Sequence, residues 1–282
     1  MRRYLAIALV LSAAQATQAA EKTLDRTFSV SPGGALVVET DGGDVRVSAS
    51  DANQVVVHMF FRGSEKDVEG TTLDAVQKGN GVTVTMKKEK HGWSWFSWGN
   101  WSGEQIIEVK VPRRYEVNVH TGGGSVDLKD TEGVAILRTS GGDISANDVD
   151  GNLELKTSGG SIVADTIKGD VDADTSGGDV RLLHIDGRIK ANTSGGSVRC
   201  SLAGANRGIS ATTSGGDIEV SVPRGTTGNV DAGTSGGDIE SELPITTTTF
   251  KESRIAGTLN GGGEAIYAHT SGGSIRLRAD GN

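Results

Sequence analysis

The sequence has few cysteines, aromatic residues and prolines. Cys200 is the one cysteine among 282 residues, so no disulfide can form within the chain. Aromatic residues make up only 4% of the chain, and four residues are proline. Acidic residues outnumber basic ones by 36 to 28, which disfavours nucleic acid as a partner. The fold must therefore be held by an aliphatic core and by backbone hydrogen bonds.

Motifs for catalysis, metals and cofactors are also missing. The five histidines are scattered and lack a ligand spacing such as H-E-x-x-H, and no glycine-rich run continues into Gly-Lys-Ser/Thr. Cys200 takes the place that Ala146, Ala164 and Leu182 have in neighbouring repeats, which predicts a buried residue and not a reactive thiol. We expect no metal, no cofactor and no enzymatic activity.

What the chain does contain is a repeat. Thr-Ser-Gly-Gly, followed by Asp or Ser and then by Ile or Val, occurs seven times, with looser copies at Thr40 and Thr121. The seven copies begin at Thr139, Thr157, Thr175, Thr193, Thr213, Thr234 and Thr270. From Thr121 to Thr193 the spacing is 18 residues four times, and it is then 20, 21 and 36. A fixed period is the signature of a stacked array, in which 36 counts as two periods.

Inside each period, apolar or small residues alternate with polar ones on both sides of the glycine pair, as at Leu153 and Leu155 and then at Ile162 and Ala164. Period two predicts two strands per repeat. Gly-Gly is expected to supply the positive φ of a tight reversal, and Gly151 marks a second corner. We predict an all-β fold, a single-stranded β-solenoid (parallel β-helix-like) with two-strand coils of about 18 residues. A meander of antiparallel hairpins would show the same alternation, but a constant phase favours stacking.

The polar residue after the glycine pair alternates between Ser and Asp down the array. The series is Ser125, Asp143, Ser161, Asp179, Ser197 and Asp217. Equivalent residues of stacked coils lie about 4.8 Å apart, so alternation keeps the carboxylates two coils apart. If the coils stack in chain order, Asp217 and Asp238 break this rule, because they fall in successive periods.

Three regions follow from these patterns. Residues 1–20 are predicted to be a signal peptide, because Arg2 and Arg3 precede an apolar run. Small residues near Ala20 then offer a cleavage site. Residues 21–120 are predicted to form a β-rich N-terminal cap and irregular coils. Residues 121–282 hold the regular repeats, with an irregular segment at 243–263. The protein is expected to be exported and to be periplasmic, on the cell surface or secreted.

A tryptophan-rich loop at residues 87–103 lies outside the repeat pattern. Its candidate contact residues are Trp93, Trp95, Phe96, Trp98, Trp101, Lys87, Lys88 and Lys90. Rings beside lysines are typical of an interfacial anchor that meets an anionic membrane surface. Stacking on a glycan, or contact with another envelope protein, is the second interpretation. The third is structural, in which the loop folds back as a cap over the first coils.

Three stretches carry a resemblance to a known family. They are Val-Pro-Arg-Arg-Tyr-Glu-Val at 111–117, Ile-Ala-Gly-Thr-Leu-Asn-Gly-Gly-Gly at 255–263 and the closing Thr-Ser-Gly-Gly-Ser-Ile at 270–275. With the repeat, they resemble the bacterial putative-adhesin family of β-strand-repeat domains of unknown function. The resemblance covers the chain from about Thr27 onward and implies an exported, non-enzymatic envelope protein. It implies no catalytic residues.

The expected function is therefore adhesin-like contact or scaffolding at the cell envelope, with the tryptophan-rich loop as the contact element. One alternative is a structural or signalling scaffold that docks another envelope protein through a face of the solenoid. A further alternative is an enzyme acting on polysaccharides, which would need a cleft built by long lateral loops. The corners of the middle coils are too short to build one.

Overall fold

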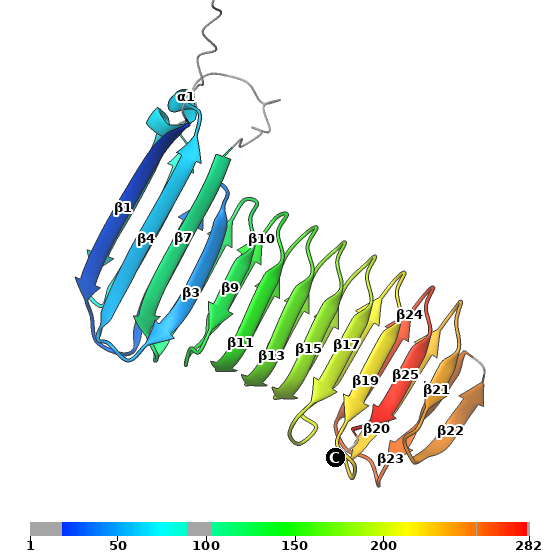
Figure 1. The fold of residues 1–282 in the computed structure, drawn as a ribbon. Helices are drawn as coiled ribbons and strands as arrows, with labels where there is room; N and C mark the ends of the chain where they lie inside the picture. The colour runs from blue at the N-terminus through cyan, green and yellow to red at the C-terminus, as the bar shows by residue number, and fades with distance from the viewer. Residues whose placement is uncertain (1–18, 89–102, 252, 281–282) are drawn as a thin grey trace, which may run out of the picture.

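The computed structural model describes residues 19–88, 103–251 and 253–280, and in these ranges nearly every element is a strand. Two long sheets pack face to face and form an elongated stack of coils (Figure 1). Most neighbouring strands are parallel, which confirms the predicted β-solenoid. Among the described residues no helix is long and apolar enough to cross a membrane. Residues 1–18, which make up most of the predicted signal peptide, lie outside the described ranges.

The strands of the two sheets, in their spatial order, have the following bounds. Sheet A contains β1 (Ala20–Ser29), β4 (Gln54–Gly63), β7 (Gly103–Pro112), β3 (Asp44–Ser50), β9 (Val126–Lys129), β11 (Ile144–Asp150), β13 (Ile162–Lys168), β15 (Val180–Asp186), β17 (Val198–Leu202), β19 (Ile218–Val222), β25 (Ile275–Ala279) and β21 (Ile239–Ser241). Sheet B contains β22 (Ile245–Lys251), β23 (Arg254–Leu259), β20 (Gly228–Thr234), β24 (Ala265–Thr270), β18 (Ile209–Thr213), β16 (Ile189–Asn192), β14 (Val171–Asp174), β12 (Leu153–Lys156), β10 (Ala135–Thr139), β8 (Tyr115–Thr121), β2 (Gly34–Thr40), β6 (Gly81–Lys88) and β5 (Thr71–Lys78).

Each regular coil places one strand in each sheet, and equivalent residues pair with the coil one period away. Leu137 pairs with Leu155, and Leu155 pairs with Ala173. The residues of these rows point inward and are fully buried, while the residues between them face solvent. The core is therefore a set of aliphatic ladders between the two sheets. Cys200 belongs to one such ladder and is buried, as predicted.

The threonine and the second glycine of the repeat form the contacts between the corners of adjacent coils. Thr175 Oγ1 donates a hydrogen bond to the carbonyl of Gly160, 2.8 Å away, in the preceding coil. A Cβ on Gly160 would lie 2.0 Å from the carbonyl oxygen of Gly142, whereas one on Gly159 would lie 3.6 Å from its nearest neighbour. Positive φ occurs at neither of these glycines. The expectation that the pair supplies positive φ is therefore wrong here, and the second glycine is needed because two backbones approach closely.

The N-terminal end combines parallel coils with antiparallel strands. The coil of β2 and β3 stacks between the coil of β8 and β9 and a longer coil made by β6 and β7. Beyond β7, strands β4 and β1 add to sheet A in antiparallel order, and β5 adds to β6 in sheet B. The short helix α1 (Glu65–Glu69) begins after Ser64, whose Oγ accepts a hydrogen bond from the Asp67 N–H.

The C-terminal end departs from chain order. The last coil, β24 and β25, lies between the coil of β18 and β19 and the coil of β20 and β21 (Figure 1). The chain thus returns after the antiparallel strands β22 and β23 and fills a gap that it had left. The coils therefore do not stack in chain order at this end. Ser274 now lies between Asp217 and Asp238, so the alternation of Ser and Asp continues without a break.

Candidate contact sites

The tryptophan-rich segment replaces one corner of the stack. In the coil of β2 and β3, only residues 41–43 connect Thr40 to Asp44. In the adjacent coil, Met86 pairs with Thr40 and Ile106 pairs with Asp44, so residues 87–105 make the same connection. The segment is therefore an enlarged version of the corner that the repeat motif forms elsewhere, at the N-terminal end of the solenoid.

Most of the predicted contact residues in this segment cannot be placed. Residues 89–102 lie outside the described ranges, and they include Trp93, Trp95, Phe96, Trp98, Trp101 and Lys90. Their role as a contact element stays a prediction. Lys87 and Lys88, which end β6, are described.

Both described lysines face carboxylates. The Nζ of Lys87 lies 2.6 Å from Oε2 of Glu39, and the Nζ of Lys88 lies 2.5 Å from Oδ1 of Asp67. The Lys88 N–H also donates to Oδ2 of Asp41 at 3.0 Å. The hydrogen bond from Lys87 lowers the pKa of Glu39, and the hydrogen bonds from Lys88 and Ser64 lower the pKa of Asp67. Both lysine charges at the base of the segment are thus paired, and an anionic surface would compete with Glu39 and Asp67 for them.

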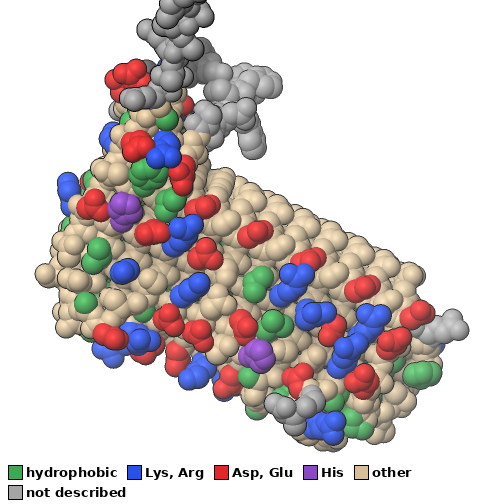
Figure 2. All heavy atoms as spheres, in the orientation of Figure 1, with side chains coloured by type: hydrophobic (Ala, Val, Ile, Leu, Met, Phe, Trp, Pro, Cys, Tyr) green, Lys and Arg blue, Asp and Glu red, His purple; other side chains and the backbone are tan. Residues whose placement is uncertain are grey.

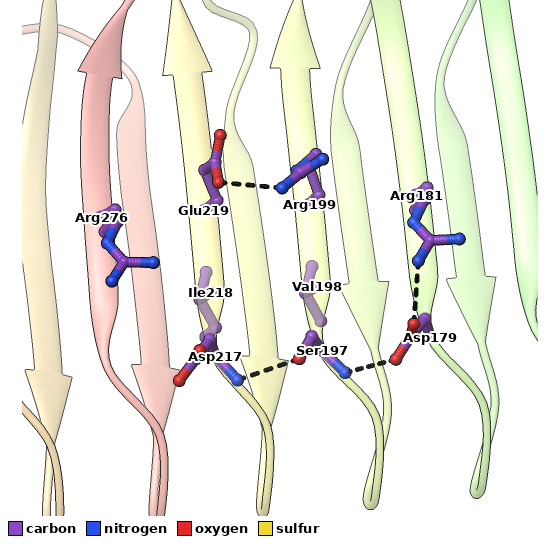
Figure 3. Close-up of a pocket in the computed structure, with 9 residues that line it drawn as sticks. All are labelled: Asp179, Arg181, Ser197, Val198, Arg199, Asp217, Ile218, Glu219 and Arg276. Atoms are coloured by element: carbon purple, nitrogen blue, oxygen red, sulfur yellow. Dashed lines mark hydrogen bonds and ion pairs between the residues drawn. The ribbon is translucent and has the colours of Figure 1, made fainter.

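A shallow depression lies on the outer face of sheet A, near the C-terminal end (Figure 3). Its cavity volume is about 150 Å³, and its charged lining residues are Asp179, Arg181, Arg199, Asp217, Glu219 and Arg276. Lys and Arg side chains are numerous on this part of the surface, where Asp and Glu lie between them (Figure 2). The depression is therefore polar and of mixed charge.

Each arginine of the depression has a carboxylate partner. Nη2 of Arg181 lies 3.1 Å from Oδ2 of Asp179, and Nη2 of Arg199 lies 3.2 Å from Oε2 of Glu219 (Figure 3). Arg276 pairs with Glu240 at 3.3 Å, outside the lining. About half of each of the Arg181 and Arg199 side chains is exposed, so these pairs can exchange partners with charged groups on another molecule. An alternating pattern of this kind suits a protein surface better than a single small anion.

The repeated Ser and Asp residues of the corners have structural partners. In the corners, Oδ1 of Asp143 accepts a hydrogen bond from the Ser161 N–H at 2.7 Å, and Oγ of Ser161 accepts one from the Asp179 N–H at 3.2 Å. The repeated Ser and Asp residues therefore join coils and are not arranged as catalytic groups. Among the described residues there is no group of three side chains that could hold a metal ion. Burial raises the pKa of Cys200 to about 12, so its thiol is not a nucleophile at neutral pH.

The sequence reasoning did not identify the charged depression. Its arginines occupy the position two residues after the Ser or Asp of the corner, where β15, β17 and β25 carry Arg and β19 carries Glu. Comparing that one position across the repeats would have shown a local concentration of arginine. The adjacency of β19 and β25 could not have been read from the spacing, because these strands are far apart in the chain.

Comparisons with known proteins agree with the fold. A family model described as Toastrack DUF4097 matches residues 34–278. No curated protein matches the chain. A structure described as a putative lipid binding protein from Parabacteroides distasonis ATCC 8503 has a TM-score of 0.50 and 16% identity, and the match covers 92% of this chain and 97% of that one. A putative adhesin from Bacteroides fragilis NCTC 9343 has a TM-score of 0.47 and 11% identity, with the same coverage of 92% and 97%.

Proposed function

The chain belongs to the Toastrack DUF4097 family, and we propose that it is an exported, non-catalytic protein that makes adhesin-like contacts at the cell envelope. In this proposal residues 1–20 direct export, and the solenoid serves as a rigid support. The tryptophan-rich segment is the contact element. Its partner is an envelope surface, either a membrane or a glycan.

One observation supports this proposal more than any other. The solenoid closes a coil with three residues at 41–43, yet it uses residues 87–105 at the equivalent corner of the next coil. That enlarged corner holds all four tryptophans of the chain. The described strands on both sides keep their pairing, so the enlargement is not needed to close the coil. Aromatic residues concentrated outside a repeat are characteristic of a contact site.

The charge balance at the base of the segment suggests which kind of contact to expect. Lys87 and Lys88 are paired with Glu39 and Asp67, so little free positive charge is contributed by these two residues. We therefore propose that the rings supply most of the binding free energy, and that anionic lipid adds less than the lysine count suggests. Binding of this kind should depend only weakly on salt.

Tryptophan fluorescence of the protein, alone and with liposomes, tests the proposal. We expect emission at long wavelength that shifts to the blue on liposome binding, with similar shifts for neutral and anionic vesicles. An unshifted long-wavelength spectrum together with binding to a glycan panel would identify the glycan as the partner. Emission that is already blue and does not respond to either would contradict the proposal and support a packed cap.

A matched variant separates contact from folding. Residues 89–102 are replaced by Gly-Ser-Gly, which shortens the corner but leaves Lys87 and Lys88 in place. We expect loss of surface binding with the thermal unfolding midpoint unchanged within a few degrees. The quadruple variant W93S/W95S/W98S/W101S should behave in the same way, and unfolding of either variant would argue for the cap.

A second function is favoured by the depression on sheet A. In this alternative the protein is a scaffold whose exposed Arg181, Arg199 and Glu219 dock another envelope protein. Capture of that protein should survive the 89–102 replacement and be lost in R181E/R199E. The opposite pattern would leave the tryptophan-rich segment as the contact element. An assay for turnover of acidic polysaccharides, with and without calcium, tests the enzyme alternative.

A further inference from the structure

Residues 228–280 form a unit that we call the C-terminal module. It contains β20 to β25, and in the described ranges β20, β21, β22 and β23 pair only with one another or with β24 and β25. Only β24 and β25 pair with strands outside the module, namely with β18 and β19. The module is therefore continuous in the chain and is joined to the other coils through one ladder interface.

That interface is built like every other boundary between coils. Inward residues continue the core ladders, as where Ala211 pairs with Ala268. Thr270 Oγ1 donates to the carbonyl of Gly216 at 2.9 Å, and Oδ1 of Asp217 accepts from the Ser274 N–H at 2.8 Å. None of these contacts depends on the module belonging to the same chain as β18 and β19.

The covalent connection across the interface is short and lies on the surface. Residues 223–227, Pro-Arg-Gly-Thr-Thr, lead from the end of β19 to the start of β20, and Gly225 has a φ of +91°. The connection passes over one whole coil position, because β24 and β25 occupy the place next to β18 and β19. Two side-chain amides donate hydrogen bonds to the backbone of this connection. Asn206 Nδ2 donates to the Thr227 carbonyl at 3.1 Å, and Asn260 Nδ2 donates to the Thr226 carbonyl at 2.9 Å.

The strands that cover the β18–β19 edge come last in the module, because residues 223–264 precede β24 and β25 in the chain. The coil of β20 and β21 comes first in the chain, but it would put Asp238 beside Asp217, and two adjacent carboxylates repel. Only a coil that offers Ser at this corner continues the alternation, and β24–β25 offers Ser274.

We propose that two copies of this chain exchange their C-terminal modules, each module docking through β24 and β25 on the β18–β19 edge of the other copy. The contacts in the closed and the exchanged forms are the same. The closed and exchanged forms differ only in the path of residues 223–227 and in the entropy lost on association. The free-energy cost of exchange between identical chains is small when the contacts are otherwise the same. A second copy is the fitting partner because it alone supplies the complete complementary coil.

Cysteine pairs placed across the interface test this proposal. Ser210 and Tyr267 are register partners on the outer face of β18 and β24, and neighbouring strands are close enough for a disulfide. The variants S210C and Y267C, like the control variants below, are made in the chain from Glu21 with Cys200→Ala, so that the introduced thiols are the only ones. The two are mixed, unfolded, and refolded together at high concentration under oxidising conditions. A disulfide-linked dimer containing one of each chain is expected, and its share should fall when refolding is done at low concentration.

Two controls make the result decisive. The double variant S210C/Y267C, refolded at low concentration, should close a disulfide within one chain, which shows that the variant folds and that the geometry is suitable. N118C mixed with I136C marks the interface of β8 and β10, a register pair between coils outside the module, and should give no linked dimer. Closure of the double variant together with no S210C–Y267C dimer at any concentration would overturn the proposal. Equal dimer yields from both mixed pairs would also overturn it, because the exchange would not be specific to the module.

Discussion

The middle coils and the C-terminal module use the same repeat motif but are assembled differently. From β9 to β19 the coils stack in chain order, and every neighbour is parallel. In the module the last coil lies inside the stack, and antiparallel β22 and β23 close sheet B. The motif therefore determines the shape of a coil, while the residue that follows the glycine pair helps to select its neighbour. Three predictions break or sharpen this comparison, and a fourth concerns the N-terminal end of the stack.

The largest effect is expected from Gly160→Ala in the middle coils. Its Cβ would overlap the backbone carbonyl of Gly142, which is held by ladders on both sides and cannot move away. We expect a loss of about 4 kcal/mol or more in urea unfolding, the range of severe backbone conflicts. Gly159→Ala is the control, since its Cβ meets no atom closer than 3.6 Å. Equal effects of the two substitutions would refute the close-approach explanation.

The same substitution in the module, Gly237→Ala, should cost less. Its Cβ would lie 2.3 Å from the carbonyl of Gly273, but the coil of β21 has no further coil beyond it in sheet A and can shift outward. We expect about half of the Gly160→Ala effect, roughly 2 kcal/mol, by the same unfolding measurement. A loss as large as that of Gly160→Ala would show that both regions are equally rigid.

A smaller effect is expected when the corner alternation is broken. Ser274→Asp would place three carboxylates in consecutive coils, beside Asp217 and Asp238. We expect a loss of about 1 kcal/mol at pH 7 relative to Ser274→Asn, since like charges opposite one another in a sheet repel. The difference should shrink as pH falls through the ordinary carboxyl range and disappear by about pH 2. A difference that does not depend on pH would exclude charge as the cause.

The smallest effect is expected at the base of the tryptophan-rich segment, where Lys88 and Asp67 form a partly buried pair. Lys88 lowers the pKa of Asp67 below its ordinary value near 3.8, so this pair stabilises the fold above that pH and the stabilisation is lost as pH falls through the lowered pKa. Lys88→Met should therefore reduce the unfolding midpoint slightly at pH 7 and not at all at pH 2. A difference that persists at pH 2 would show that Lys88 acts through packing instead.

The sequence was sufficient to predict the coil but not the order of the coils. An 18-residue spacing relates residues of adjacent coils directly, so the strands, the buried Cys200 and the inward ladders could be predicted from it. The place of β24 and β25 could not be predicted, because a coil with the same motif can pair with any open edge. The break in alternation at Asp217 and Asp238 was the one available signal, and it marks the point where the last coil is inserted.

The candidate site was predictable only in part. Composition alone picked out the tryptophan-rich segment, and the register of Met86 and Ile106 then showed which corner it enlarges. The carboxylate partners of Lys87 and Lys88 could not be foreseen, since Glu39 lies on a different coil and Asp67 lies in α1. The charged depression likewise depends on strands that the chain order keeps apart. The family resemblance inferred from the closing motifs is confirmed by the family match over residues 34–278.

The inserted last coil also determines how the molecule responds to mechanical force. A chain that ended on an outermost coil could be peeled off strand by strand when its terminus is pulled. Here a pull on the C-terminal residues acts on β25, which is hydrogen-bonded to β19 on one side and to β21 on the other. Two ladders must then shear together before any strand is released. A solenoid pulled through β25 would thus resist unravelling.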